Sequence, residues 1–126
     1  MQVRNAMRRI LLVEDEALVA MPLVYALEEA GYNVVLASDG REGLERALEQ
    51  TPDLIISDYM MPRMTGVEMI QRIRKAGVTI PIILLTAVPE RNLPRDPGHN
   101  LFLSKPYDES QLLDAVRQLV NADINK

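Results

Sequence analysis

Acidic side chains directly follow two short apolar runs, and they are the first residues of this sequence that suit chemistry. Glu14 and Asp15 follow residues 10–13, and Asp58 follows residues 54–56 with one serine between. Carboxylates gathered in one crevice repel one another and raise at least one pKa unless a cation compensates. Hard oxygen ligands with open positions suit Mg²⁺, which is often held by only one or two carboxylates. The residues therefore predict a magnesium site.

Two polar residues of other types end later apolar runs. Thr86 follows residues 82–85, and Lys105 comes two residues after the run 101–103. A lysine charge and a threonine hydroxyl beside a metal suit the equatorial oxygens of a transferring phosphoryl group. Aspartate is a known covalent acceptor of phosphate, so Asp58 is the candidate acceptor. Each residue alone is also typical of a solvated loop or turn, and only their joint placement favours the chemical interpretation.

Five strand-length apolar runs, alternating with stretches of helical spacing, must position these residues. Strand alternating with helix implies parallel strands joined by right-handed crossovers, hence an α/β fold with a doubly wound five-stranded sheet. We expect the strand order 2-1-3-4-5, in which Asp15 lies beside Asp58, Thr86 one strand further and Lys105 two strands away. The runs comprise residues 10–13, 34–36, 54–56, 82–85 and 101–103, and the helical stretches lie near residues 18–25, 44–48, 67–73 and 112–120.

Capping patterns mark where two of these helices begin. Asp39 stands three residues before Glu42, and Thr65 stands three residues before Glu68, a spacing that satisfies free amides of a first helical turn. Asp39 is therefore interpreted as a helix cap rather than as part of the acidic site. Pro22 falls inside the first helical stretch, where a proline removes a hydrogen bond and predicts a kink.

Composition excludes several classes of function. The 126 residues, 48% of them hydrophobic, suffice for one ordinary core, and a net charge of −4 argues against direct binding to nucleic acid or anionic lipid. The chain has no cysteine and only one histidine, His99, which excludes disulfides, thiolate chemistry and a histidine-rich zinc site. No apolar run approaches the roughly 18 residues typical of a membrane span, so we expect a soluble cytoplasmic protein.

Four separated motifs occur along the chain in the order Val13-Glu-Asp-Glu16, Asp58-Tyr-Met-Met-Pro62 with Thr65-Gly66, Leu85-Thr-Ala87 and Ser104-Lys-Pro106. Together they resemble those of the receiver domain of two-component response regulators. The resemblance extends over residues 8–121, with residues 1–7 as a loose N-terminal extension and residues 122–126 as a C-terminal tail. It implies a flavodoxin-like fold and a signalling module rather than an enzyme.

The resemblance also implies roles for individual residues and a class of partner. Asp58 would accept phosphate from a phosphohistidine of a sensor histidine kinase or a histidine phosphotransfer protein. Asp15, Asp58 and the carbonyl of Met60 would coordinate Mg²⁺, with Glu14 acting through water. Lys105 would contact the phosphoryl group.

Three further expectations follow from the family. Thr86 would move toward the phosphoryl group, and Phe102 would then turn inward as an aromatic switch, although plain core packing is the alternative interpretation of Phe102. The Lys105–Pro106 bond is often cis in such proteins, which the sequence leaves open. His99 is expected to be an ordinary loop residue, since the phosphohistidine belongs to the partner.

The segment 88–100 departs from the family pattern. Pro89, Pro94 and Pro97 cannot share one regular helix, because an interior proline costs about 3 kcal/mol or more. We expect a degenerate or disordered fourth helix, with one turn at most beginning at Pro89. The hypothesis is that this segment is a mobile loop that orders on phosphorylation or partner binding. Receivers often signal through the face formed by their fourth helix, fifth strand and fifth helix, so we expect that face to differ here.

Apolar residues stand at two positions that flank the path of the hydrolytic water in the family. Met60 lies two residues after Asp58, and Val88 lies two residues after Thr86. Neither side chain can orient a water, so a phosphorylated Asp58 is expected to hydrolyse slowly.

Several functional alternatives remain open at this point. With little sequence after residue 121, we expect no output domain on this chain, which would be a stand-alone regulator, a phosphate shuttle or a receiver excised from a larger kinase or regulator. A small magnesium-dependent phosphohydrolase is the enzymatic alternative, but no second acid stands two residues after Asp58. A third alternative is a degenerate receiver that only binds partners, but the chain keeps Asp15, Asp58, Thr86 and Lys105, which argues against it.

Overall fold

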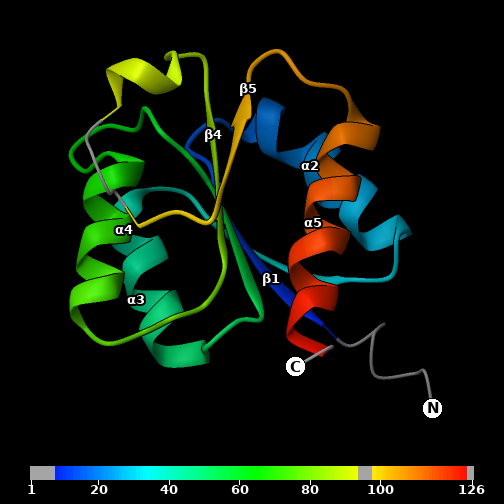
Figure 1. Cartoon of the computed structure of the whole chain (residues 1–126), viewed down its shortest axis with the longest axis horizontal. Coiled ribbons are helices and arrows are strands. Elements are labelled where there is room, and N and C mark those ends of the chain that lie inside the picture. The colour runs from blue at the N-terminus through cyan, green and yellow to red at the C-terminus, as the bar shows by residue number, and fades with distance from the viewer. Residues whose placement is uncertain (1–7, 94–97, 125–126) are drawn as a thin grey trace.

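A five-stranded parallel sheet forms the centre of the molecule (Figure 1). The structure is a computed structural model, and it describes residues 8–93 and 98–124. The strand order is β2-β1-β3-β4-β5, which confirms the predicted doubly wound, flavodoxin-like α/β fold. Each neighbouring pair of strands runs parallel. The strands are β1 (Arg9–Val13), β2 (Asn33–Ala37), β3 (Leu54–Asp58), β4 (Ile82–Thr86) and β5 (Leu101–Ser104).

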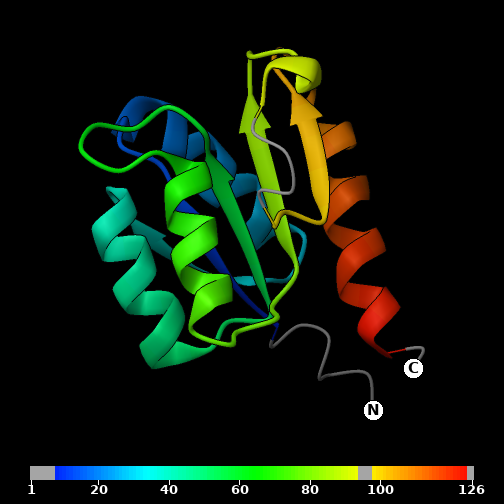
Figure 2. The same ribbon diagram turned by 60° about the vertical axis from the view of Figure 1, so that its left-hand side comes forward.

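Helices cover both faces of this sheet and create two separate cores (Figure 2). On one face, α2 (Ala17–Glu29) and α5 (Glu109–Ile124) pack on side chains such as Ile10 and Ile56. On the other, α3 (Gly40–Gln50) and α4 (Gly66–Lys75) pack on residues such as Leu11. Because β3 and β4 are covered on both sides, they are buried along their whole length. Among the described residues, no helix is both long and apolar enough to span a membrane.

The predicted caps begin two of the helices. The Asp39 carboxylate accepts a hydrogen bond from the backbone N–H of Glu42 at 2.8 Å, and the Thr65 hydroxyl accepts one from the N–H of Glu68 at 3.1 Å. Both caps satisfy amides that a first helical turn leaves without partners. Asp39 is thus confirmed as a helix cap. Pro22 lies exposed within α2, which continues on both sides of it.

The connection between β4 and β5 contains a single 3₁₀ turn, η1 (Glu90–Asn92), among its described residues. The backbone N–H of Asn92 donates to the carbonyl of Pro89 at 2.8 Å, so the turn starts where the sequence predicts. The expectation that residues 88–100 form no regular helix, but at most one turn, is thus confirmed for the described part of this segment. The hypothesis that this segment is mobile concerns residues 94–97 in part, and these lie outside the described residues, as do residues 1–7 and 125–126.

A glycine on α3 lets three elements approach one another closely. A Cβ atom added to Gly43 would lie 2.8 Å from the Met69 sulfur of α4 and 2.8 Å from a methyl carbon of Val13 on β1. Such distances are shorter than side-chain carbons tolerate, so only glycine fits without displacing a neighbour. The packing of α3 against β1 and α4 positions the end of β1, where the acidic residues begin.

We predict that Gly43→Ala lowers the free energy of unfolding by about 1 to 3 kcal/mol through overpacking. Helix propensity alone would have the opposite sign, because alanine is favoured over glycine in a helix interior by about 1 kcal/mol. Urea unfolding followed by circular dichroism measures the difference. Glu45→Ala, an exposed change on the same helix, is the control and is expected to stay within about 0.5 kcal/mol of wild type. A Gly43→Ala variant more stable than wild type would refute the packing argument.

Candidate functional site

Three carboxylates meet at the carboxyl edge of the sheet. Glu14 and Asp15 follow β1, Asp58 is the last residue of β3, and a ligand oxygen from each lies within 4.8 Å of the other two. Glu14 and Asp58 are buried, at 4% and 7% exposed, whereas Asp15 is exposed. The predicted convergence of these acids is therefore present, and it arises because β1 and β3 are neighbours in the sheet.

Backbone contacts hold Glu14 and Asp58 in place. The N–H of Glu14 donates to the carbonyl of Ala37 on β2 at 3.0 Å, and the Glu14 carboxylate accepts from the N–H of Glu16 at 3.0 Å. A Cβ atom added to Gly66 would lie only 2.2 Å from the carbonyl oxygen of Asp58. The Thr65-Gly66 pair, singled out as part of a motif, thus allows α4 to begin directly against the end of β3.

Lys105 reaches Asp58 from two strands away. It follows β5, and its Nζ atom donates a charge-assisted hydrogen bond to Oδ1 of Asp58. Its backbone N–H donates to the carbonyl of Thr86 at 2.9 Å, which fixes the base of the side chain. The Lys105–Pro106 peptide bond, left open by the sequence, is cis.

Thr86 and Met60, two further residues of the predicted site, differ in exposure. Thr86 ends β4, is 2% exposed, and its hydroxyl accepts a hydrogen bond from the N–H of Val88 at 2.9 Å. Met60 lies just beyond the end of β3 and is 62% exposed. The ligand role of the Met60 carbonyl stays a prediction.

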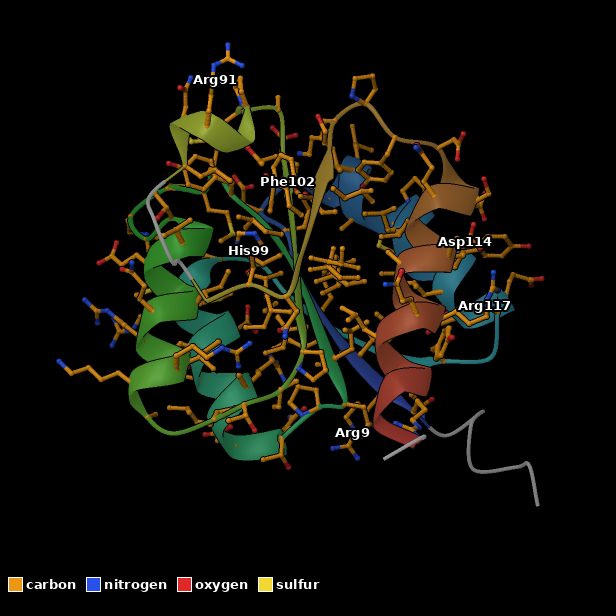
Figure 3. All side chains as sticks on the ribbon, viewed as in Figure 1. Arg9, Arg91, His99, Phe102, Asp114 and Arg117 are labelled. Carbon is orange, nitrogen blue, oxygen red and sulfur yellow. The ribbon has the colours of Figure 1, made fainter. Side chains whose placement is uncertain are left out.

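Phe102 lies on β5 and is half-buried. Among the described residues it belongs to neither of the two buried clusters, whereas its neighbours Leu101 and Leu103 pack against the cluster that contains Ile10. Its ring centroid lies 6.4 Å from that of His99, with the two planes tilted by 50° (Figure 3). Phe102 is thus half-buried beside His99, and both its role as a switch and the alternative of plain core packing stay predictions.

Burial and like charge together perturb the acidic cluster. Burial, opposed by the hydrogen bond from Glu16 and reinforced by the charge of Asp58, raises the pKa of Glu14 from 4.5 to about 7. Burial would lower the pKa of Lys105, but its hydrogen bond to Asp58 and the charges of Asp58 and Glu14 raise it. Lys105 thus stays charged and compensates part of the negative charge.

The donor set suits a hard divalent cation. All three side chains offer carboxylate oxygens, and their mutual spacing allows a single ion to touch one oxygen of each. Burial first, and then the charge of Asp58, raise the pKa of Glu14, and a bound cation would oppose both effects. The residues present therefore fit the predicted Mg²⁺.

Tyr107 is a residue of this site that the sequence interpretation missed. It is half-buried, burial raises its pKa, and it interacts electrostatically with Lys105, Asp58 and Glu14. Its position two residues after Lys105 was the one available signal. A cavity of about 340 Å³, lined by Asp39, Arg41, Pro62, Arg63 and Met64, includes none of the predicted site residues.

We predict that Glu14→Gln stabilises the metal-free protein in a pH-dependent way. Folding raises the pKa of the Glu14 carboxyl from 4.5 to about 7, so below pH 4.5 the protonated carboxyl makes its full contribution to stability. This contribution is lost as the pH rises to about 7 and the carboxyl ionises in the folded protein. Glutamine keeps the acceptor for the N–H of Glu16 and carries no charge. The advantage of the variant should therefore grow between these pH values to about 1 to 3 kcal/mol and then level off.

Thermal unfolding in the presence of a chelator, from pH 4.5 to 8.5, measures this difference. Glu45→Gln, an exposed glutamate on α3, serves as the control and should run parallel to wild type. Parallel curves for Glu14→Gln would show that Glu14 ionises normally in the folded protein.

Comparison with known proteins gives one consistent result. A match to the response regulator receiver domain family covers residues 10–117. The transcriptional regulatory protein PdtaR of Mycobacterium tuberculosis H37Rv is 41% identical over 118 residues, which are 90% of this chain and 57% of that protein. The chain spans about half the length of the curated relatives it matches, from 48% to 57% in two of them.

Solved structures agree with the sequence match. The receiver domain of the Francisella response regulator 1452 has a TM-score of 0.87 and 27% identity, covering 92% of this chain and 98% of that one. The receiver domain of the sensor histidine kinase PA1611 from Pseudomonas aeruginosa PAO1, with a magnesium ion coordinated in its active-site cleft, has a TM-score of 0.84 and 30% identity, covering 91% and 98%. With its five-stranded fold, its acidic pocket and these matches, the chain belongs to the response regulator receiver domain family, a signalling module of two-component systems rather than an enzyme.

Proposed function

We propose that this chain is the phosphoacceptor of a His–Asp phosphorelay, with Asp58 as the residue that receives the phosphoryl group. The donor would be a phosphohistidine on a sensor histidine kinase or a histidine phosphotransfer protein. One observation carries the proposal: the buried carboxylate of Asp58 shares a cluster with Glu14 and Asp15 and also contacts the ammonium of Lys105.

The chemistry of the transfer suits these side chains. A carboxylate oxygen of Asp58 would attack phosphorus, the P–N bond of the phosphohistidine would break, and the imidazole would leave with the bonding electrons. Lys105, already beside Oδ1 of Asp58, would hold its charge next to the transferred oxygens. Glu14, Asp15, Asp58 and the carbonyl of Met60 would hold Mg²⁺, which when bound neutralises negative charge on the phosphoryl group.

The phosphorylated chain would signal by protein–protein contact. Thr86 is one strand from Asp58, and its hydroxyl contacts only the outgoing backbone at Val88 among the hydrogen bonds of the described residues. A change of partner by this hydroxyl would alter the segment that leads into η1, next to β5. The net charge of −4 argues against direct binding of this chain to nucleic acid.

We predict that the wild-type chain gains one phosphoryl group when it is incubated with Mg²⁺ and phosphoramidate, a small donor that also transfers across a P–N bond. Asp58→Asn keeps the shape of the side chain but removes the nucleophilic carboxylate, so it should gain none. Intact mass measurement separates the two forms. Asp114→Asn, an exposed change on α5, is the control and should be modified like wild type. Equal gain by Asp58→Asn, or none by wild type, would contradict the assignment.

We further predict a slow loss of the phosphoryl group, because neither Met60 nor Val88 can orient a water. Met60→Asn or Val88→Glu would add one hydrogen bond to the attacking water, worth about 0.5 to 1.5 kcal/mol. The lifetime of the phosphorylated chain should then fall roughly 2- to 12-fold. Mass measurement at successive times after removal of the donor gives the lifetimes, and Met60→Leu is the apolar control. An unchanged lifetime in both polar variants would mean that another feature controls hydrolysis.

A further inference from the structure

Arg74, in the last turn of α4, holds the segment that leads into β5. Its guanidinium donates three hydrogen bonds, from Nε to the carbonyl of Gly98 at 3.0 Å, from Nη1 to the carbonyl of Val78 at 2.9 Å and from Nη2 to Oδ1 of Asn100 at 3.0 Å. Val78 precedes β4, whereas Gly98 and Asn100 precede β5. One side chain therefore ties together the starts of two neighbouring strands and the end of a helix.

Asn100 extends the pairing of β4 with β5 by one residue. Its backbone N–H donates to the carbonyl of Ile82 at 2.9 Å, and its side-chain oxygen accepts from the N–H of Ile82 at 2.9 Å. The same side-chain oxygen accepts the bond from Arg74. Arg74 thus orients the amide of Asn100, which in turn sets where β5 begins against β4.

Close packing reinforces these hydrogen bonds. Gly98 has a φ of +98°, a backbone conformation that favours glycine, and a Cβ atom there would lie 2.9 Å from Ile70 and 3.0 Å from Cγ of Arg74. The backbone of the segment therefore rests directly on α4. Arg74 is itself half-buried, and burial lowers its pKa, so its three acceptors offset the cost of removing its charge from water.

This attachment matters because β5 is the least supported strand of the sheet. It is an edge strand of four residues that pairs only with β4, and none of its residues is fully buried. Its far end leads directly into Lys105, the residue that contacts Asp58. Figure 3 labels Phe102, which lies on β5, and His99, which precedes the strand.

We propose that Arg74 is a positioning residue for Lys105: by fixing Asn100 and the start of β5, it sets the register in which Lys105 reaches Asp58. The connection between β4 and β5 has only the short turn η1 among its described residues, so no longer helix there packs against the sheet. The hydrogen bonds from α4 fix the start of β5 instead. The importance of this for phosphoryl transfer rests on the proposed function, whereas the effect on the Lys105–Asp58 contact does not.

Two measurements on the unphosphorylated full chain test the proposal. Hydrogen exchange reports the backbone amides of Asn100 and Lys105, which bond to β4. Trace acetylation with peptide mapping reports how often the ammonium of Lys105, 33% exposed at its side chain, leaves Asp58, with exposed Lys75 as the internal reference. In Arg74→Gln we expect both to become about 10-fold faster relative to wild type.

Three variants separate positioning from general loss of stability. Arg72→Gln changes an exposed arginine of the same last turn, which pairs only with Glu68 among the described residues, and should match wild type. Val116→Ala destabilises the core between α5 and the sheet and should not change Lys105 selectively. Asn100→Asp keeps the acceptor oxygen and should preserve the protection that Asn100→Leu loses.

Each result decides the question. Selective opening of β5 and Lys105 in Arg74→Gln and Asn100→Leu, but not in the other variants, supports the proposal. Wild-type labelling of Lys105 in Arg74→Gln, or equal opening in Val116→Ala, overturns it. Neither readout involves phosphorylation, so failure of the proposed function would leave this test intact.

Discussion

The rest of this structure depends on the gathering of like charges where the sheet ends. Glu14 and Asp58 are buried beside Asp15, and the ammonium of Lys105 contacts Asp58. Carboxylates held this close favour a cation, and burial together with the charge of Asp58 raises the pKa of Glu14. Such an arrangement needs a rigid support, because small separations of the strands would disperse the charges. Central strands that are covered by helices on both faces supply that support.

The two signs of charge come from parts of the sheet with different support. Two of the acids directly follow β1 and the third ends β3, and each of these strands has a strand on both sides. The lysine follows β5, which has a neighbour on one side only and is incompletely buried. Hydrophobic packing therefore holds the acids, whereas polar contacts from Arg74 and Asn100 secure the strand that brings the lysine. An edge strand held in this way is suited to responding to a change at Asp58, since its position depends on few contacts.

Local signals in the sequence explain why so much of the fold was predictable. The caps at Asp39 and Thr65 work within three residues, and Pro89 starts a turn by its own geometry. The alternation of apolar runs with helical spacing restricted the topology to few choices, and the strand order expected among them is confirmed by the structure. The role of Phe102 was ambiguous because an apolar residue in a strand gives the same sequence pattern whether its side chain faces a core or a partly open segment. For Tyr107 the sequence offered only its position two residues after Lys105, and no local pattern marked the hydrogen bonds of Arg74, because the partners of both residues are brought close only by the folded chain.

The sequence by itself determined the five strands, the caps, the identity of the acids and of Lys105, and the absence of room for a regular fourth helix. Those properties depend on residue type, short spacing and the geometry of proline. Only the tertiary structure decided that the three acids lie within 4.8 Å of one another, that Lys105 contacts Asp58, that its peptide bond to Pro106 is cis and that α4 holds the start of β5. These outcomes depend on distances between residues far apart in the chain. Such distances are set by the packing of the helices against the sheet, not by any neighbouring residues.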